Sequence, residues 1–307
     1  MALQKEIWIA DIEKQLFASN QFMNVVGKDH SAYIENITVH VPQAGARPGV
    51  AKDRTSLPAS INQRTDVDLT YNLSQYSSDP TLITDLDELQ INYSKRQDVL
   101  ESHIKTLSDA ISNQTLYAWA ASGASRIVRT TGTASSTALA PSATSTRLAI
   151  TLADLRAAAA KLDKDNIIDE ERYCILPSDM YWQLIGDSEV RKALEFGRPT
   201  QIMGELPMVA GIYLIKRSSV VVYDNTGTPV IKAVGSDGVP TSPATSDNLG
   251  ALVVSKSYVC KAKGTTKVYA DEDKPEYYGS IFSAQVQHGA AKLRTNQEGI
   301  VSIVQAA

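Results

Sequence analysis

The chain has 307 residues, of which 43% are hydrophobic, and this length is enough for one large or two ordinary domains. A net charge of -4 gives no electrostatic reason for tight binding to nucleic acid, and no run reaches the roughly eighteen apolar residues of a membrane-spanning helix. The first residues lack the basic and then apolar layout of a signal peptide, so we expect a protein kept in a cytoplasmic compartment.

An N-terminal arm is predicted over residues 1–35. Residues 3–17 carry apolar side chains at approximately helical spacing, Trp8 and Phe17 among them. A segment this short cannot bury those side chains by itself. We therefore expect the arm to dock on another surface, and Trp8 and Phe17 are candidate contacts between subunits.

A long β-hairpin is predicted next. Residues 34–41 and 65–71 alternate between apolar and polar side chains in the manner of strands, and Pro42 is expected to end the first of them. The intervening stretch is rich in Gly and Pro and forms the tip. Because an isolated two-stranded hairpin is marginal in water, we expect it to lie on a neighbouring subunit. The charges of the tip that suit such a contact are Arg47, Lys52 and Arg54.

A rod-like helix over residues 83–119 is the most distinctive predicted element. Pro80 favours a helix start, and apolar residues from Leu82 to Ala118 recur at helical spacing. At roughly 35–40 residues this helix is far longer than the mean of about 11. The residues before this helix carry few large apolar side chains with which to form a core. A long helix after such a segment is typical of a subunit whose buried surface is completed by contacts with neighbouring copies.

The middle of the rod is expected to pack within its own subunit. Leu100, Ile104 and Leu107 lie on one stripe of the predicted helix. We expect this stripe to contact strands at the C-terminal end of the chain, including Ile300 and Ile303.

The rest of the chain predicts an α+β fold with helices in its middle. Residues 120–147 have the Ser, Thr, Ala and Gly content of a loop or loose strand pair. Thr151 is placed to cap a helix over 152–162, and a loop is expected over 224–248. Further strands are predicted over 173–176, 209–215, 219–223, 249–254 and 300–304, and further helices from Pro177 and over 187–196.

No catalytic, metal or cofactor site is predicted. The four histidines lack metal-ligand spacing and are expected at surface or half-buried positions, and the acidic stretch from Asp163 lacks the glycine of a calcium loop. No nucleophile elbow, dinucleotide fingerprint or phosphate loop occurs. Cys174 and Cys260 lie in apolar runs and are expected as buried thiols, with a disulfide as the alternative.

Two charged clusters suit contacts with partners. The lysines of residues 256–267 are expected along a solvated strand edge, with a nucleic-acid patch as the alternative. A short acidic run is expected in a turn, where it could contact the basic hairpin tip of another copy. Its members are Asp271, Glu272 and Asp273.

The order of these parts resembles the major capsid protein of tailed bacteriophages, which has the Hong Kong 97-like capsid fold. The rod over 83–119 is similar to the spine helix of that family, and residues 36–77 to its extended loop (E-loop). Residues 152–184 resemble its helix–strand–Pro–helix passage, 204–218 its strand ending at Ser, and 277–304 its closing segment. The resemblance implies an N-terminal arm (1–35), an E-loop (36–77), a peripheral P-domain (78–148 and 262–307) and an axial A-domain (149–261).

The resemblance also implies a function. It implies a structural protein, not an enzyme, that assembles through hexamers and pentamers into an icosahedral head shell around the double-stranded DNA of a tailed phage or prophage. Expected partners are further copies, a portal and a separate scaffolding protein, with DNA enclosed without sequence-specific binding and no cofactor or membrane. The expected location is the virion capsid, assembled in the bacterial host cytoplasm. No residue marks the covalent Lys–Asn crosslink of the family.

Two alternatives remain open at this point. An encapsulin-type nanocompartment shell has the same fold and encloses enzymes. An unrelated enzyme or binding protein could use the rod helix as a dimer seam.

Overall fold

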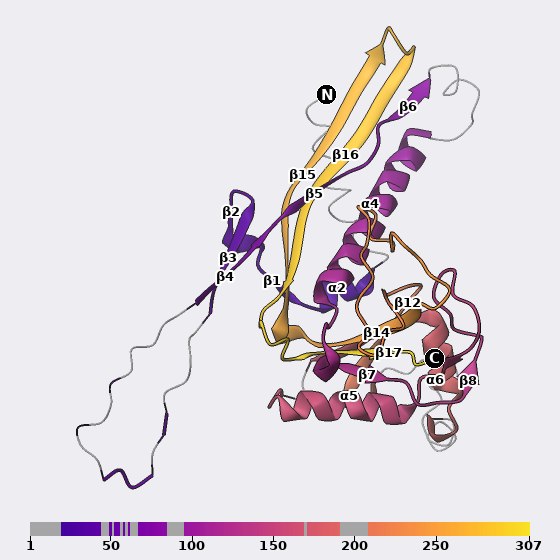
Figure 1. The fold of residues 1–307 in the computed structure, drawn as a ribbon. Coiled ribbons are helices and arrows are strands. Elements are labelled where there is room, and N and C mark those ends of the chain that lie inside the picture. Colours follow the sequence, from indigo (N-terminus) through magenta and orange to yellow (C-terminus); the bar gives the residue numbers. More distant parts are fainter. Residues whose placement is uncertain are drawn as a thin grey trace.

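The computed structural model describes residues 20–43, 49, 50, 52–55, 58, 61, 67–84, 95–168, 171–190 and 208–307. Figure 1 shows a compact part built on a mixed sheet, from which a long two-stranded ribbon and one long helix rise side by side. A short hairpin leaves the base of the ribbon in another direction. Among the described residues no helix is long and apolar enough to cross a membrane.

The compact part contains a seven-stranded sheet in the order β11-β12-β10-β14-β17-β7, with β13 paired to β14. Its central strands β14 and β17 are buried along their whole length, which accounts for their nearly continuous apolar sequences. Helices α5 (Leu152–Lys164) and α6 (Ser178–Gly186) pack on one face of this sheet. The strands are β7 (Ile127–Arg129), β10 (Arg172–Pro177), β11 (Met208–Val209), β12 (Ile212–Arg217), β13 (Val221–Tyr223), β14 (Asn248–Ser255) and β17 (Ile300–Val304).

The ribbon belongs to a second, five-stranded sheet. Strands β15 (Val259–Lys274) and β16 (Gly279–Lys292) are antiparallel and much longer than the others. β1 (Lys28–Asp29) pairs with the start of β15, while β5 (Ser74–Ser77) and β6 (Thr81–Thr84) pair with β16. The hairpin sheet contains β2 (Ile34–Glu35), β3 (Thr38–Gln43) and β4 (Val67–Asn72), and a small ladder joins β8 (Ala134–Ser135) to β9 (Arg147–Leu148). The remaining helix α2 is Gln21–Val25, and the 3-10 turns are Ser31–Tyr33, Ala124–Arg126 and Lys256–Tyr258.

The rod helix is confirmed at its C-terminal end and was predicted too long at the other. α4 runs over Lys95–Trp119. Residues Thr81–Thr84, which the spacing assigned to the helix, form strand β6 and pair with β16. Three of these four residues are β-branched, which favours a strand when a partner edge is available. Residues 85–94 of the predicted helix lie outside the described part.

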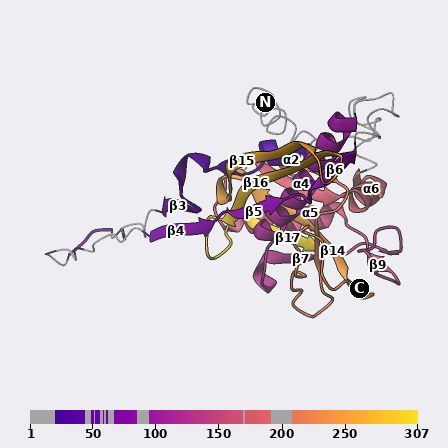
Figure 2. The ribbon, with the colours of Figure 1, turned by 90° about the horizontal axis from the view of Figure 1, so that it is seen from above.

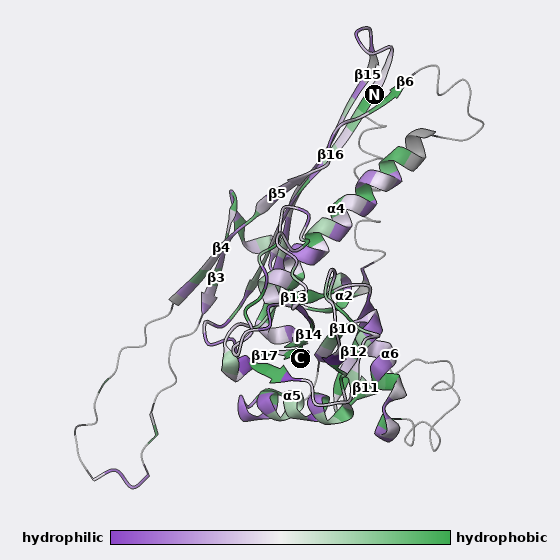
Figure 3. Ribbon diagram, turned by 45° about the vertical axis from the view of Figure 1, so that its right-hand side comes forward, coloured by the Kyte–Doolittle hydropathy of each residue, from purple (hydrophilic) through white to green (hydrophobic). Residues whose placement is uncertain are grey.

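The stripe of α4 is buried within the subunit, as expected. Ile104 and Leu107 lie in one apolar cluster with Ile300, and Leu100 packs against that cluster. Ile303 does not belong to it, because successive residues of a strand face opposite sides and Ile303 packs with α5 and α6. Figure 3 shows hydrophobic and hydrophilic residues interleaved along α4, as a helix with one covered face requires.

Several predicted elements of the compact part are confirmed. Thr151 and Asp154 form a capping box at the start of α5, so two N-terminal N–H groups are satisfied reciprocally. Pro177 precedes α6, and the predicted strands over 173–176, 249–254 and 300–304 lie within β10, β14 and β17. The helix predicted over 187–196 begins at residue 188, and residues 191–207 lie outside the described part.

Two predicted strands are interrupted by turns. The strand over 34–41 breaks at Asn36, whose φ of 58° places it in the left-handed region, and Ile37 beside it is 56% exposed. Pro42 does not end β3 but pairs with Asp68. The strand over 209–215 likewise breaks at Ala210, which has a φ of 51° and begins the turn between β11 and β12.

The predicted domain division stays a prediction, and its boundaries cut through one of the two large sheets. Strand β17, assigned to a peripheral segment, pairs in the seven-stranded sheet with β14 of 149–261, and β7, assigned to the other peripheral segment, pairs with β17. A boundary drawn along the chain therefore separates residues that share one sheet.

Candidate assembly surfaces

The β3–β4 hairpin lies beside the body, and its described strands contact the body through Val39, which packs with Ala262, and through Gln43. The strands pair from Thr38 with Asn72 to Gln43 with Val67, and Figures 1 and 2 show them to one side of the two large sheets. At the end of the described ladder that leads to the tip, the Gln43 side-chain amide donates a hydrogen bond to the carbonyl oxygen of Leu293. Among the described side chains of the two strands only Val39 is buried, so most of the hairpin surface stays available to another molecule.

The described tip of the hairpin combines positive charge with uncovered aliphatic side chains. Lys52 and Arg54 are exposed, and their predicted contact with another copy stays a prediction, while Arg47 lies outside the described residues. Val50 and Ile61 are 98% and 97% exposed. Sequence reasoning missed these two residues, although isolated aliphatic residues in a Gly- and Pro-rich stretch are a usable signal. Contiguous exposed apolar patches mark interaction sites, whereas single exposed apolar side chains are common on protein surfaces.

The outer half of the ribbon offers a second surface. β1 pairs with β15 only at Cys260 and Lys261, so from Thr266 onward β15 pairs only with β16 among the described residues. An unpaired strand edge of this length presents free N–H and C=O groups to a partner strand. Three tyrosines near the end of the ribbon are also exposed, namely Tyr269, Tyr277 and Tyr278.

The acidic run lies in this ribbon and not in the predicted turn. Asp271 belongs to β15, and its carboxylate is 2.8 Å from the ammonium nitrogen of Lys274. Glu272 and Asp273 are in the same strand, because the turn begins only after Lys274. Trp8 and Phe17 lie outside the described residues. Within the described part of the chain, the acidic run in β15 and the hairpin tip lie on different elements, the ribbon and the hairpin.

The histidines and lysines near the base of the ribbon are more buried than expected. His30, His103 and His288 are buried, which corrects their predicted surface or half-buried placement, and only His40 is half exposed. Burial lowers the pKa of His288 to about 3, with Lys261 adding to the effect. Burial also lowers the pKa of Lys261, which lies between β1 and β16 and not along a solvated edge.

The cysteines are free and buried, as predicted. Burial raises the pKa of the Cys174 thiol, and it raises that of Cys260 to about 11. Thiols in such surroundings stay protonated and are poor nucleophiles. Among the described residues no group of three or more His, Cys, Asp or Glu side chains is placed to hold a metal ion.

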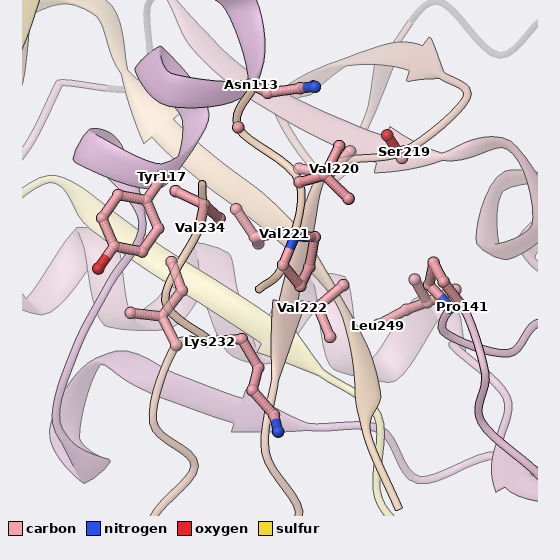
Figure 4. Close-up of a pocket in the computed structure, with 14 residues that line it drawn as sticks. Asn113, Tyr117, Pro141, Ser219, Val220, Val221, Val222, Lys232, Val234 and Leu249 are labelled. Carbon is pink, nitrogen blue, oxygen red and sulfur yellow. The ribbon is translucent and has the colours of Figure 1, made fainter. Parts of the chain in front are cut away.

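One apolar pocket lies between α4, β13 and the loop before β14. Its volume is about 90 Å³, and Figure 4 shows Tyr117, Val221 and Val234 around it. The charged group at its wall, Lys232, pairs with Asp247 at 3.0 Å. The pocket has room for a small apolar group and shows no paired acid and base for catalysis.

The solved structures that this chain resembles agree on the fold. No protein-family model and no curated protein matches the sequence. The capsid of cyanophage P-SCSP1u is 18% identical, with a TM-score of 0.63 over 93% of this chain and 88% of that one. A structure from Mycobacterium phage Che8 is 14% identical, with a TM-score of 0.60 over 92% and 90% of the two chains. A virus-like particle from Pyrococcus furiosus is 10% identical, with a TM-score of 0.53 over 98% and 99%. The chain therefore has the Hong Kong 97-like capsid fold that its sequence resembles.

Proposed function

We propose that this chain, which has the Hong Kong 97-like capsid fold, is a major capsid protein that assembles into the icosahedral head shell of a tailed phage or prophage. One observation carries the proposal: the β3–β4 hairpin and the outer β15–β16 ribbon leave the body and present surfaces that the described chain does not cover. A subunit of this shape gains buried area only by contact with other copies. The whole-length likeness to phage capsid structures supports the same function.

Hexamers and pentamers are the expected intermediates, because rings of identical subunits close through heterologous contacts. The shell would enclose double-stranded DNA without sequence-specific binding. The net charge of -4 fits this role, as does the pairing of Lys232, Lys256 and Lys274 with carboxylates of the chain itself. We further propose a portal and a separate scaffolding protein as partners, and assembly in the bacterial host cytoplasm.

A second candidate is a nanocompartment shell of the encapsulin type. The observation in its favour is the likeness to the virus-like particle from Pyrococcus furiosus, which spans nearly the whole of both chains. The two candidates share the shell and differ in what it encloses.

Imaging of the purified protein tests the shell directly. We expect closed particles of uniform size in negative stain, either from the chain alone or after co-expression with a scaffolding protein. Particles recovered from a lysogen should contain DNA if the first candidate is right, and protein cargo if the second is. A species of about 67 kDa, twice the 33.3 kDa of one chain, under all these conditions would support the dimeric enzyme or binding protein instead.

A further inference from the structure

On its C-terminal side the hairpin is joined to the ribbon sheet through a single residue. β4 ends at Asn72 and β5 begins at Ser74, so only Leu73 separates a strand of the hairpin sheet from a strand of the ribbon sheet. The chain changes its pairing partner there, from β3 before Leu73 to β16 after it. The direction of β4 relative to the ribbon therefore depends on how Leu73 is held.

Leu73 is held in a space made by two glycines. Its side chain is buried and packs with Val39 and Ala262. A methyl group added at Gly289 would lie 2.9 Å from Cδ2 of Leu73, and one added at Gly264 would lie 3.1 Å from its Cδ1. Both distances are shorter than ordinary contacts between carbon atoms of about 3.5–4 Å. The absence of side chains at these two positions of the ribbon makes the room for Leu73.

The ribbon is irregular at the same place. The pairing of β15 with β16 shifts between Lys263 and Thr266, so Gly264 lies in a bulge. The Thr265 hydroxyl donates to Oε1 of Gln287 at 3.0 Å and holds the bulge across the ribbon. A bulge bends its strand and often serves to re-aim a neighbouring group.

Main-chain contacts complete the joint. The N–H of Leu73 donates to the carbonyl oxygen of Ile37 at 2.7 Å, which ties the joint to the turn between β2 and β3. A methyl group at Gly289 would also lie 3.0 Å from the carbonyl oxygen of Asn72. Glycine in a strand interior weakens the strand, and a close approach of another backbone is a usual reason for its presence.

We propose that Gly264 and Gly289 form a socket for Leu73, and that this socket sets the direction of the hairpin and thereby the geometry in which copies of the chain close into a shell. Leu73 and the two glycines are positioning residues, because they place the hairpin surface and do not themselves form it. The second half of the proposal rests on the proposed function, whereas the first half concerns the single chain.

A distance measurement on the unassembled chain tests the socket. Nitroxide labels on Thr70→Cys in β4 and Lys164→Cys in α5 report the direction of the hairpin, since both positions are exposed and the native cysteines are buried. We expect one narrow distance distribution for the parent chain. Leu73→Ala empties the socket and Gly289→Ala fills it, so each should broaden or shift that distribution. Gly227→Ala is the matched control, because nothing lies within 4 Å of a methyl group there.

Assembly of the same variants tests the second half of the proposal, the role of the socket in shell closure, separately from the first half. We expect Leu73→Ala and Gly289→Ala to lose closed particles or to form particles of irregular size, while Gly227→Ala assembles like the parent chain. If Gly289→Ala does not fold, Gly264→Ala replaces it, since its closest contact is the flexible Gln287 side chain. Unchanged distance distributions in the folded variants would overturn the socket. Altered distributions with normal shells would overturn its role in closure, and a parent chain that never forms shells would overturn the proposed function alone.

Discussion

At the scale of single residues, the buried end of α4 is held by a compact polar network. The Tyr223 hydroxyl is 2.8 Å from the carbonyl oxygen of Ala121 and 2.8 Å from the hydroxyl of Ser302. The N–H of Ala121 donates to that same serine oxygen at 3.1 Å. All three groups are satisfied if Tyr223 donates to Ala121 and accepts from Ser302. The network joins the end of α4 to β13 and β17, where an unpaired polar group would be costly.

Removal of the Tyr223 hydroxyl should therefore lower the stability of the fold, because this one oxygen atom serves two hydrogen bonds. We expect Tyr223→Phe to reduce the free energy of unfolding by about 1–3 kcal/mol, because a buried carbonyl oxygen and a serine hydroxyl lose their partner. Tyr213→Phe, at a half-exposed position of β12, is the control and should change it little. Equal stability of both variants in urea denaturation would contradict the network.

His288 should make the fold sensitive to acid. Its pKa is lowered to about 3 in the folded chain by burial, helped by Lys261 and Lys263 and opposed by Asp29. The unfolded chain takes up this proton below about pH 6.5, so stability is complete above that pH and is lost as the pH falls from about 6.5 towards 3. At pH 5 the loss from this residue is on the order of 2 kcal/mol.

Denaturation at a series of pH values isolates this contribution. The difference in unfolding free energy between pH 7 and pH 5 should be smaller in His288→Gln than in the parent chain. His40→Gln changes a half-exposed histidine that pairs with Asp68 and serves as the control. If the unfolding free energy of the parent chain and of His288→Gln fell equally between pH 7 and pH 5, His288 would not be the cause of the acid sensitivity.

At the scale of elements, α4 shows what the sequence could and could not predict. The spacing of Leu100, Ile104 and Leu107 predicted a buried stripe, because helical periodicity is a local property of the chain. The predicted start of the helix was wrong, because Thr81–Thr84 pairs with β16. That strand lies about 200 residues later in the chain, so a local sequence pattern does not predict the pairing. The turns at Asn36 and Ala210 were missed because neither is a glycine, although both have positive φ.

The stripe gives a sharp test at one position. Ile104→Asp places a carboxylate in the cluster that contains Ile300, and we expect a loss of about 4 kcal/mol or more, with insoluble or unfolded protein. Lys105→Asp introduces the same residue at the adjacent exposed position and should leave a folded, soluble chain. Circular dichroism and thermal melting distinguish the two. A cooperatively folding Ile104→Asp protein would mean that the stripe is not part of the subunit core.

At the scale of the whole molecule, the order of elements could be predicted better than the surfaces. Among the described residues, the β3–β4 hairpin, α4 and the seven-stranded sheet with its helices follow one another in the order that the resemblance implied, and the fold is the one it named. The predicted contact residues were chosen by charge or, for Trp8 and Phe17, by apolar spacing, since both are visible in sequence whereas exposure is not. Val50, Ile61 and the ribbon tyrosines were therefore missed, and Asp271 was found paired with Lys274.

The central claim is that the hairpin serves assembly and not the core of its own subunit. Replacing residues 44–66 by Asn-Gly keeps the pair of Gln43 and Val67 and supplies a turn suited to a two-residue hairpin loop. Sedimentation velocity of this variant beside the parent chain, under conditions in which the parent assembles, tests the claim most directly. We predict fast-sedimenting closed particles for the parent, and a folded species no larger than single subunits or small rings for the variant, with an unchanged melting temperature. A variant that assembles like the parent, or one that unfolds, would contradict it.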